Sequence, residues 1–243
     1  MKPMRQLAAF VIALVLCTTL LPVAAAQSAD EFVIQNGVLV KYTGSGGSVV
    51  IPDGITRIGR EAFYQCTEVT SITIPNSVTD IGSRAFQKSG LTSIMIPSSV
   101  TYIGEFAFSI DTLTSFSVNP NNPSFCSKDG VLYNKDQTVL LVYPRGKAES
   151  SFIIPEGVTH IEKWAYSEGN LMNISIPSSV ESIGEGAFYG AISHLKDVYY
   201  SGTKEQWNRI AIDKNNSGLT DAVIHYNSYI RSYRSLWGSQ KNC

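Results

Sequence analysis

The side chains in this sequence best suited to proton transfer or metal binding are its three histidines, His160, His194 and His225. Metal and catalytic sites bring such residues together at short, recognisable spacings, as two histidines one helical turn apart do in zinc proteases. These three lie far from one another in the sequence, and no set of partner residues accompanies them. We therefore expect neither a metal ligand nor a catalytic residue among them.

The other motifs that could carry chemistry give the same result. The glycine-rich run Gly44–Gly47 links two expected strands and precedes no helix, so it predicts a turn and not a phosphate-binding loop. The carboxylates are scattered, and spacing does not place a pair such as Asp197 and Glu205 within the distance that glycosidase chemistry requires. No nucleophile elbow of the G-x-S-x-G type occurs. The sequence predicts a chain that is not an enzyme and that uses no cofactor.

A phrase that returns about every 22 residues dominates the rest of the sequence. It reads SITIPNSVTDIGSRAF from Ser71, SIMIPSSVTYIGEFAF from Ser93 and NISIPSSVESIGEGAF from Asn173, and a divergent copy, IIPEGVTHIEKWAY, begins at Ile153. A fixed period of this length means that each copy is a small unit that buries its apolar side only by stacking on its neighbours. The stacked copies must therefore position any functional surface.

Each copy predicts a short strand followed by a compact return. In the copy that begins at Val69, Ile72 and Ile74 alternate with polar residues, which is typical of a strand with one buried side, and Pro75 ends it. The apolar residues that follow recur at spacings of about three and four, which favours one or two helical or 3₁₀ turns. A glycine then marks most returns, where a side chain would clash or would need a positive φ, but Glu162 replaces it in the divergent copy.

Two columns of residues are expected to face the interior of the stack. The first column contains the inward residues of the strands, and the second is an aromatic ladder on the return side. The inward strand residues are Val49, Ile51, Ile72, Ile74, Ile94, Ile96, Phe116, Val118, Phe152, Ile154, Ile174, Ile176, Val198 and Tyr200, and the ladder contains Phe63, Phe86, Phe108, Tyr166 and Phe188.

The motif L/V-x-x-I-x-I-P-x-x-V-x-x-I-G-x-x-A-F, seen over Leu91–Phe108 and Leu171–Phe188, resembles the BspA-type leucine-rich repeat of bacterial secreted and cell-surface proteins. The resemblance covers about Phe32–Tyr226. It implies an α/β leucine-rich-repeat solenoid, right-handed, with short parallel strands on one face, short helical or 3₁₀ returns and β-hairpin insertions. It also implies an adhesion or binding module with protein or glycan partners, such as host matrix or another cell surface.

The sequence predicts three segments. Residues 1–26 resemble a secretory signal peptide, because basic residues precede an apolar run and a small-residue cleavage site. Residues 27–226 are expected to form the solenoid, and residues 227–243 a disordered tail. Within the solenoid we expect an N-terminal cap at 31–52, a hairpin insertion at 119–151 with strands at 130–133 and 139–143, and a C-terminal cap at 202–226 whose short helix begins with a capping box, Thr203–Gln206.

Composition excludes several classes of partner. The formal net charge is -1 and charged residues make up 16% of the chain, so no basic field is available for nucleic acid. After the leader, no stretch approaches the roughly 18 apolar residues that a membrane span requires. We expect a protein that is secreted or lies at the extracellular cell surface. An odd number of cysteines, Cys66, Cys126 and Cys243, would remain after cleavage, and so we expect no obligatory disulfide.

The outward side of the strands is the candidate partner-binding face. The expected function is non-enzymatic binding of a protein or glycan through many hydrogen bonds, with a few apolar anchors. An alternative is that small hydroxyl residues simply fit a crowded sheet face. The candidate residues are Ser71, Thr73, Ser93, Met95, Ser115, Ser117, Ile153, Asn173, Ser175, Asp197 and Tyr199.

Two other functions stay open at the level of sequence. The chain could be a structural spacer or the recognition part of a larger secreted assembly, whose binding site is the hairpin Gly130–Tyr143. The second of these alternatives is a carbohydrate-active enzyme, which the absence of a recognisable carboxylate pair disfavours.

Overall fold

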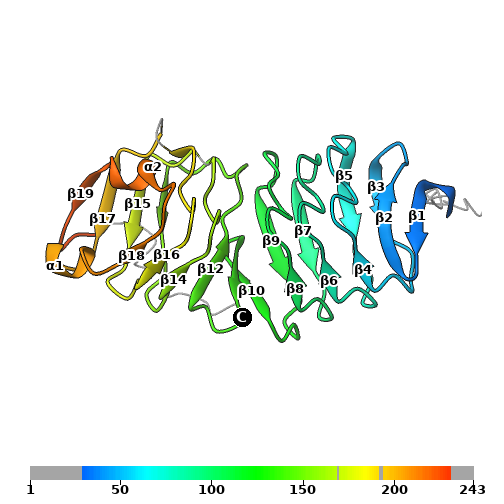
Figure 1. Cartoon of the computed structure of the whole chain (residues 1–243), viewed down its shortest axis with the longest axis horizontal. Helices are drawn as coiled ribbons and strands as arrows, with labels where there is room; N and C mark the ends of the chain where they lie inside the picture. Colours follow the sequence, from blue (N-terminus) through cyan, green and yellow to red (C-terminus); the bar gives the residue numbers. More distant parts are fainter. Residues whose placement is uncertain (1–28, 169, 192–193, 231–243) are drawn as a thin grey trace, which may run out of the picture.

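The structure is a computed structural model that describes residues 29–168, 170–191 and 194–230. These residues form an elongated solenoid whose strands stack one after another along the long axis (Figure 1). The predicted signal peptide, 1–26, and most of the predicted tail, 227–243, lie outside the described residues. Within the described part, no helix has both the length and the apolar character needed to cross a membrane.

One side of the solenoid carries the strands that the repeat predicts. They pair in parallel within three separate sheets, with the copies in register, so that Ile94 lies beside Phe116 and Ile174 beside Val198. The predicted inward residues are buried, except that Ile72, Val118 and Phe152 are half-buried, and the prediction of this column is confirmed. The strands are β3 (Gly47–Val50), β5 (Val69–Thr73), β7 (Ser93–Ile96), β9 (Ser115–Val118), β13 (Ser151–Ile153), β15 (Asn173–Ile176), β17 (Asp197–Tyr200) and β19 (Val223–His225).

The return side carries two further sheets built largely from two-residue strands. The first begins with an antiparallel hairpin and continues in parallel, and the second does the same. The first sheet contains β1 (Phe32–Gln35), β2 (Val38–Tyr42), β4 (Arg57–Ile58), β6 (Asp80–Ile81) and β8 (Tyr102–Ile103). The second contains β10 (Phe125–Lys128), β11 (Val131–Asn134), β12 (Val139–Val142), β14 (His160–Ile161), β16 (Ser182–Ile183) and β18 (Ala211–Ile212).

The returns are successive tight turns, and the prediction of helical or 3₁₀ returns is wrong in this respect. Glu61, Arg84 and Trp164 occupy equivalent places in their returns and have φ values of 58°, 58° and 60°. A left-handed residue at that place prevents a run of i to i-4 hydrogen bonds. Backbone N–H groups cross to the next copy instead, as Phe63 N does to Ala85 O at 2.7 Å. The spacing of three and four thus reflects consecutive turns.

The helices are short pieces. They include η1 (Ala29–Glu31), α1 (Lys204–Trp207) and α2 (Ser217–Thr220). The predicted capping box of α1 is confirmed, since Gln206 N donates to Thr203 Oγ1 at 3.3 Å and Thr203 N donates to Gln206 Oε1 at 2.8 Å. These two bonds satisfy backbone donors that the start of a helix otherwise leaves without partners.

The repeated glycines are required by close approach between copies. A Cβ at Gly82 would lie 2.8 Å from Arg60 N, and one at Gly104 would lie 2.5 Å from Ser83 N. Both distances are shorter than real Cβ contacts. The sequence suggested two reasons for these glycines, a steric clash or a positive φ. At Gly82 and Gly104 the steric clash is the reason, and a positive φ is not.

The apolar interior is divided into two cores by the inserted strands β10, β11 and β12. Leu132 on β11 belongs to the core formed by the N-terminal copies, whereas its neighbours Val131 and Tyr133 belong to the core formed by the C-terminal copies. Because alternate residues of a strand point to opposite faces, β11 buries both faces. Strand β10 was not predicted, since Phe125–Lys128 ends in two polar residues and offers little alternation.

Candidate functional site

The outward residues of the strands form two rows, which together we call the strand face. One row is almost entirely hydroxylic in the N-terminal copies, where Ser48 pairs with Ser71 and Ser93 with Ser115. The other row mixes small polar and apolar residues. That second row contains Val50, Thr73, Met95 and Ser117, and then Ile153, Ser175, Tyr199 and His225.

The structure exposes most of the residues that the sequence analysis placed on the strand face. Met95 is 52% exposed and Ile153 is 39% exposed, so both are available as apolar anchors. Asp197 is the one charged residue among the eleven candidates. The exposed candidates also include Ser71, Thr73, Ser93 and Ser117, and the half-buried ones are Ser115, Asn173, Asp197 and Tyr199.

Ser175 differs from the other candidates because it is 4% exposed. Its hydroxyl donates to Tyr199 O at 3.4 Å and lies between the flanking strands β13 and β17. It therefore cannot contact a partner directly. The sequence analysis also missed Val50, which is exposed on β3 beside Thr73; the apolar pair Val49–Val50 was a signal that only one of the two faces the interior.

The last strands close the strand face with a small polar cluster. His225 Nε2 lies 2.7 Å from Asp197 Oδ1, and the His225 ring stacks on Tyr199 at 4.8 Å between centroids. His225 was expected to have no metal or catalytic role, and here it packs against two candidate residues of the face. Across the part of the chain that the structure describes, no three or more His, Cys, Asp or Glu side chains gather in a way that could hold a metal ion.

A second candidate site lies where the two cores meet, at a junction that we call the seam. It separates Glu105–Asp111 from Tyr143–Arg145 and Glu162–Glu168. On the N-terminal side, the aromatic ladder stacks Phe63, Phe86 and Phe108 at 5.2 and 5.7 Å, which confirms the predicted column. It then turns aside, since Phe108 next meets Phe116 edge-on at 5.2 Å.

On the C-terminal side of the seam, a second ladder begins at Tyr143. This ring meets Tyr166 edge-on at 5.1 Å, and Tyr166 meets Phe188 at 5.6 Å. Burial raises the pKa of Tyr143 and of Tyr166 well above the ordinary tyrosine value. The predicted ladder is therefore present as two separate stacks, one in each core.

Arg145 joins the two sides of the seam. Its side chain is 14% exposed, and it donates to Ser109 Oγ at 3.3 Å and to Ser167 Oγ at 2.9 Å. It also pairs with Asp111 at 3.3 Å and Glu168 at 2.5 Å. Nη2 bonds both serines and Nη1 pairs with both carboxylates, so the planar guanidinium serves both sides of the seam through a fixed geometry that a point charge does not reproduce.

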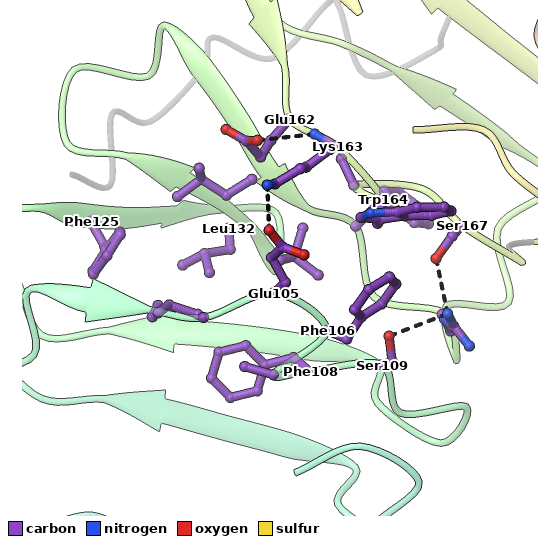
Figure 2. A pocket seen from close by; sticks show the side chains of 18 of the residues that line it. Glu105, Phe106, Phe108, Ser109, Phe125, Leu132, Glu162, Lys163, Trp164 and Ser167 are labelled. Atoms are coloured by element: carbon purple, nitrogen blue, oxygen red, sulfur yellow. Dashed lines mark hydrogen bonds and ion pairs between the residues drawn. The ribbon is translucent and has the colours of Figure 1, made fainter. Parts of the chain in front are cut away.

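Beside this contact the seam forms a cavity of about 330 Å³ that is partly open to solvent, which we call the seam cavity. Figure 2 shows Lys163 reaching across it toward Glu105, and the Trp164 ring lying above Phe106. The hydrogen bond with Glu105 raises the pKa of Lys163. The Phe106 and Trp164 rings lie 5.1 Å apart, and both residues are half-buried.

The departures from the repeat explain why the cavity exists. Glu162 stands where most copies have glycine, and its side chain lines the cavity, so the position has space that the other copies lack. Trp164 lies against Gly186, where an added Cβ would fall 2.3 Å from the indole ring. The glycine replaced by Glu162 was the sequence signal for this site, although it was interpreted only as a change of packing.

The inserted hairpin contributes side chains to both cores. Val131, Leu132 and Tyr133 are buried, and so are Leu140 and Tyr143, whereas residues 134–139 at its turn are half-buried or exposed. The hypothesis that Gly130–Tyr143 presents a binding surface stays a prediction, and it rests on this turn. The hairpin also contributes to the wall of the seam cavity through Leu132, Leu141 and Val142.

Stacked copies of one small unit, each completing its neighbour's apolar core, define this chain as a leucine-rich-repeat solenoid protein. The chain belongs to the BspA-type leucine-rich-repeat family. The model of that family, described as BspA type Leucine rich repeat region, matches residues 39–133 and 146–233 in six copies. No curated protein matches the sequence.

Solved structures of similar chains come from bacteria. A leucine rich cell surface protein from Faecalibacterium prausnitzii is 28% identical with a TM-score of 0.54, and the match covers 69% of this chain and 63% of that one. The pneumococcal vaccine antigen PcpA is 20% identical with a TM-score of 0.54, and the match covers 75% of this chain and 57% of that one. The chain thus spans less than two thirds of either structure, and the second likeness concerns the fold alone.

Proposed function

We propose that this chain is a secreted or surface-exposed, non-enzymatic module that binds a protein partner through the strand face. The observation that carries the proposal is the composition of that face: exposed hydroxyl residues in register, a few exposed apolar residues, and a single carboxylate among the candidates. Such a face offers hydrogen bonds and apolar anchors at low desolvation cost. The likeness to a leucine rich cell surface protein supports the location.

The geometry favours recognition over a broad area. Within each sheet, parallel strands lie about 4.8 Å apart, so outward side chains repeat at a regular spacing. Met95 and Tyr199 lie on opposite sides of the inserted hairpin, on β7 and β17. A partner that contacts both must span the seam. Between the two anchors, the same row contains the exposed Ser117, the exposed Ile153 and the buried Ser175.

The proposal is tested by placing charge on the strand face. We expect Met95→Arg and Tyr199→Glu each to weaken retention on immobilised extracellular matrix proteins by at least about tenfold, since burying an unpaired charge at an interface is costly. Tyr64→Glu is the matched control, because Tyr64 is exposed on the return side. Circular dichroism checks that the fold is intact. Equal retention of the strand-face variants and the control would contradict the proposal.

A further inference from the structure

The seam cavity has the size and the lining of a ligand site. Phe106, Phe125 and Trp164, which are all half-buried, contribute apolar surface to it from three separate segments of the chain (Figure 2). Its volume of about 330 Å³ lies at the lower end of the range for small-molecule pockets, roughly 300 to 1,000 Å³. The cavity therefore suits a small molecule better than a peptide segment.

The cavity is a consequence of the fold on both of its sides. On one side, Phe108 is the last parallel ring of the ladder and packs edge-on against Phe116. On the other, Tyr143 packs against Phe152 and Tyr166, at 4.8 and 5.1 Å between ring centroids. Neither ladder therefore caps the other, and an apolar space is left between them. A preformed cavity lowers the entropic cost of binding.

The polar groups around the cavity are engaged with one another. Lys163 pairs with Glu105, and Glu162 Oε1 accepts the backbone N–H of Lys163 at 3.1 Å. Arg145 is bonded on both sides of the seam, and Arg84 lies over the Phe106 ring at 5.9 Å. A charged ligand would have to displace one of these pairings. An uncharged ligand would leave them all in place.

The Glu105–Lys163 pair lies at the accessible part of the cavity. The two side chains are 51% and 45% exposed, and the residues are far apart in the sequence. Exposed ion pairs contribute little stability and open readily. We propose that the seam cavity binds a small, uncharged, ring-containing apolar molecule, which enters when the Glu105–Lys163 pair opens. The occupant packs against Phe106 and Phe125 and lies beside Trp164.

The proposal is tested with N-phenyl-1-naphthylamine, a neutral probe that fluoresces in apolar surroundings. The protein is the chain from Gln27 onward, the predicted exported form. We expect saturable binding and energy transfer from tryptophan to the probe, most of which is lost in Trp164→Phe. Val142→Phe, which fills the cavity from β12, raises the dissociation constant at least tenfold. Val40→Phe is the matched control on β2, outside the cavity, and leaves it unchanged.

Two further arms test the charge preference and the entry route. Indole displaces the probe, whereas indole-3-acetate, which has the same ring and a negative charge, does so at least tenfold less well. Lys163→Met raises the association rate severalfold. Should Val142→Phe fold poorly, the energy-transfer comparison between the unaltered protein and Trp164→Phe decides the location. Absence of saturable binding, equal energy transfer in Trp164→Phe, or tighter binding of indole-3-acetate would overturn the proposal.

Discussion

Replacing Arg145 with methionine should lower the free energy of unfolding by about 3 kcal/mol, because two buried serine hydroxyls lose the guanidinium that donates hydrogen bonds to them. Ser109 and Ser167 are 7% and 5% exposed, so each oxygen that loses the guanidinium keeps little access to water. Leaving a buried polar group without its partner costs about 1 to 3 kcal/mol. The pairs with Asp111 and Glu168 add at most about 1 kcal/mol each, since both carboxylates are exposed.

Urea denaturation measures this loss and its effect on cooperativity. Far-ultraviolet circular dichroism reports the whole solenoid, whereas Trp164 and Trp207 report the C-terminal side of the seam. The two transitions should coincide in the unaltered protein and separate in Arg145→Met, because Arg145 couples neighbouring cores. Arg145→Lys should restore less than half of the lost stability.

Arg60→Met provides the matched control for this experiment. Arg60 is 68% exposed and pairs with the neighbouring Glu61 at 3.3 Å, so its loss should cost below about 0.5 kcal/mol. The reasoning is refuted if Arg145→Met costs less than about 1 kcal/mol, if the control costs as much, or if Arg145→Lys is as stable as the unaltered protein.

Three further predictions concern the cores and the turns. Phe86→Ala should cost about 3 to 5 kcal/mol by chemical denaturation, because the ring is fully buried between two others, whereas Tyr189→Ala, on an exposed side chain, should cost below about 1 kcal/mol. Gly90→Ala should cost more than about 2 kcal/mol, since its Cβ would lie 2.0 Å from Thr67 O. Gly157→Ala should cost only about 1 kcal/mol, because Gly157 has a φ of +92° but open space around it. Similar melting temperatures for the two variants would contradict this prediction. Burial raises the pKa of Tyr166, so from about pH 10 upward the unfolded state releases this proton while the folded state retains it. Tyr166 should therefore add no pH dependence below about pH 10 and should lower the free energy of unfolding as the pH rises above it. Urea midpoints at several pH values should fall less steeply in Tyr166→Phe.

The sequence was a reliable guide wherever a residue's role depends on its own copy and the next one. Ile94 and Ile174 face inward because strand alternation and a period near 22 residues determine both their side and their neighbours. Thr203 caps α1 because a capping box is local by construction. These predictions needed no knowledge of distant contacts.

The sequence was a poor guide wherever two conformations share one spacing or a distant segment intervenes. Apolar residues at intervals of three and four suit a helix and also successive turns, and the left-handed φ at Arg84 decides between them. Ser175 has the residue type of an exposed position, but strands on both sides bury it. Strand β11 was predicted, yet its burial on both faces depends on two cores that form separately.

The sequence by itself determined a stack of leucine-rich repeats, the columns that fill it and the outward row that includes Met95, because a short repeat encodes contacts between adjacent copies. Only the tertiary structure decided that the inserted strands β10, β11 and β12 interrupt the stack and leave a separate core on either side. It also decided that Glu105 and Lys163 meet across a cavity, although they are 58 residues apart. No local pattern specifies such a meeting, because it depends on how the inserted strands separate two copies that would otherwise pack directly against each other.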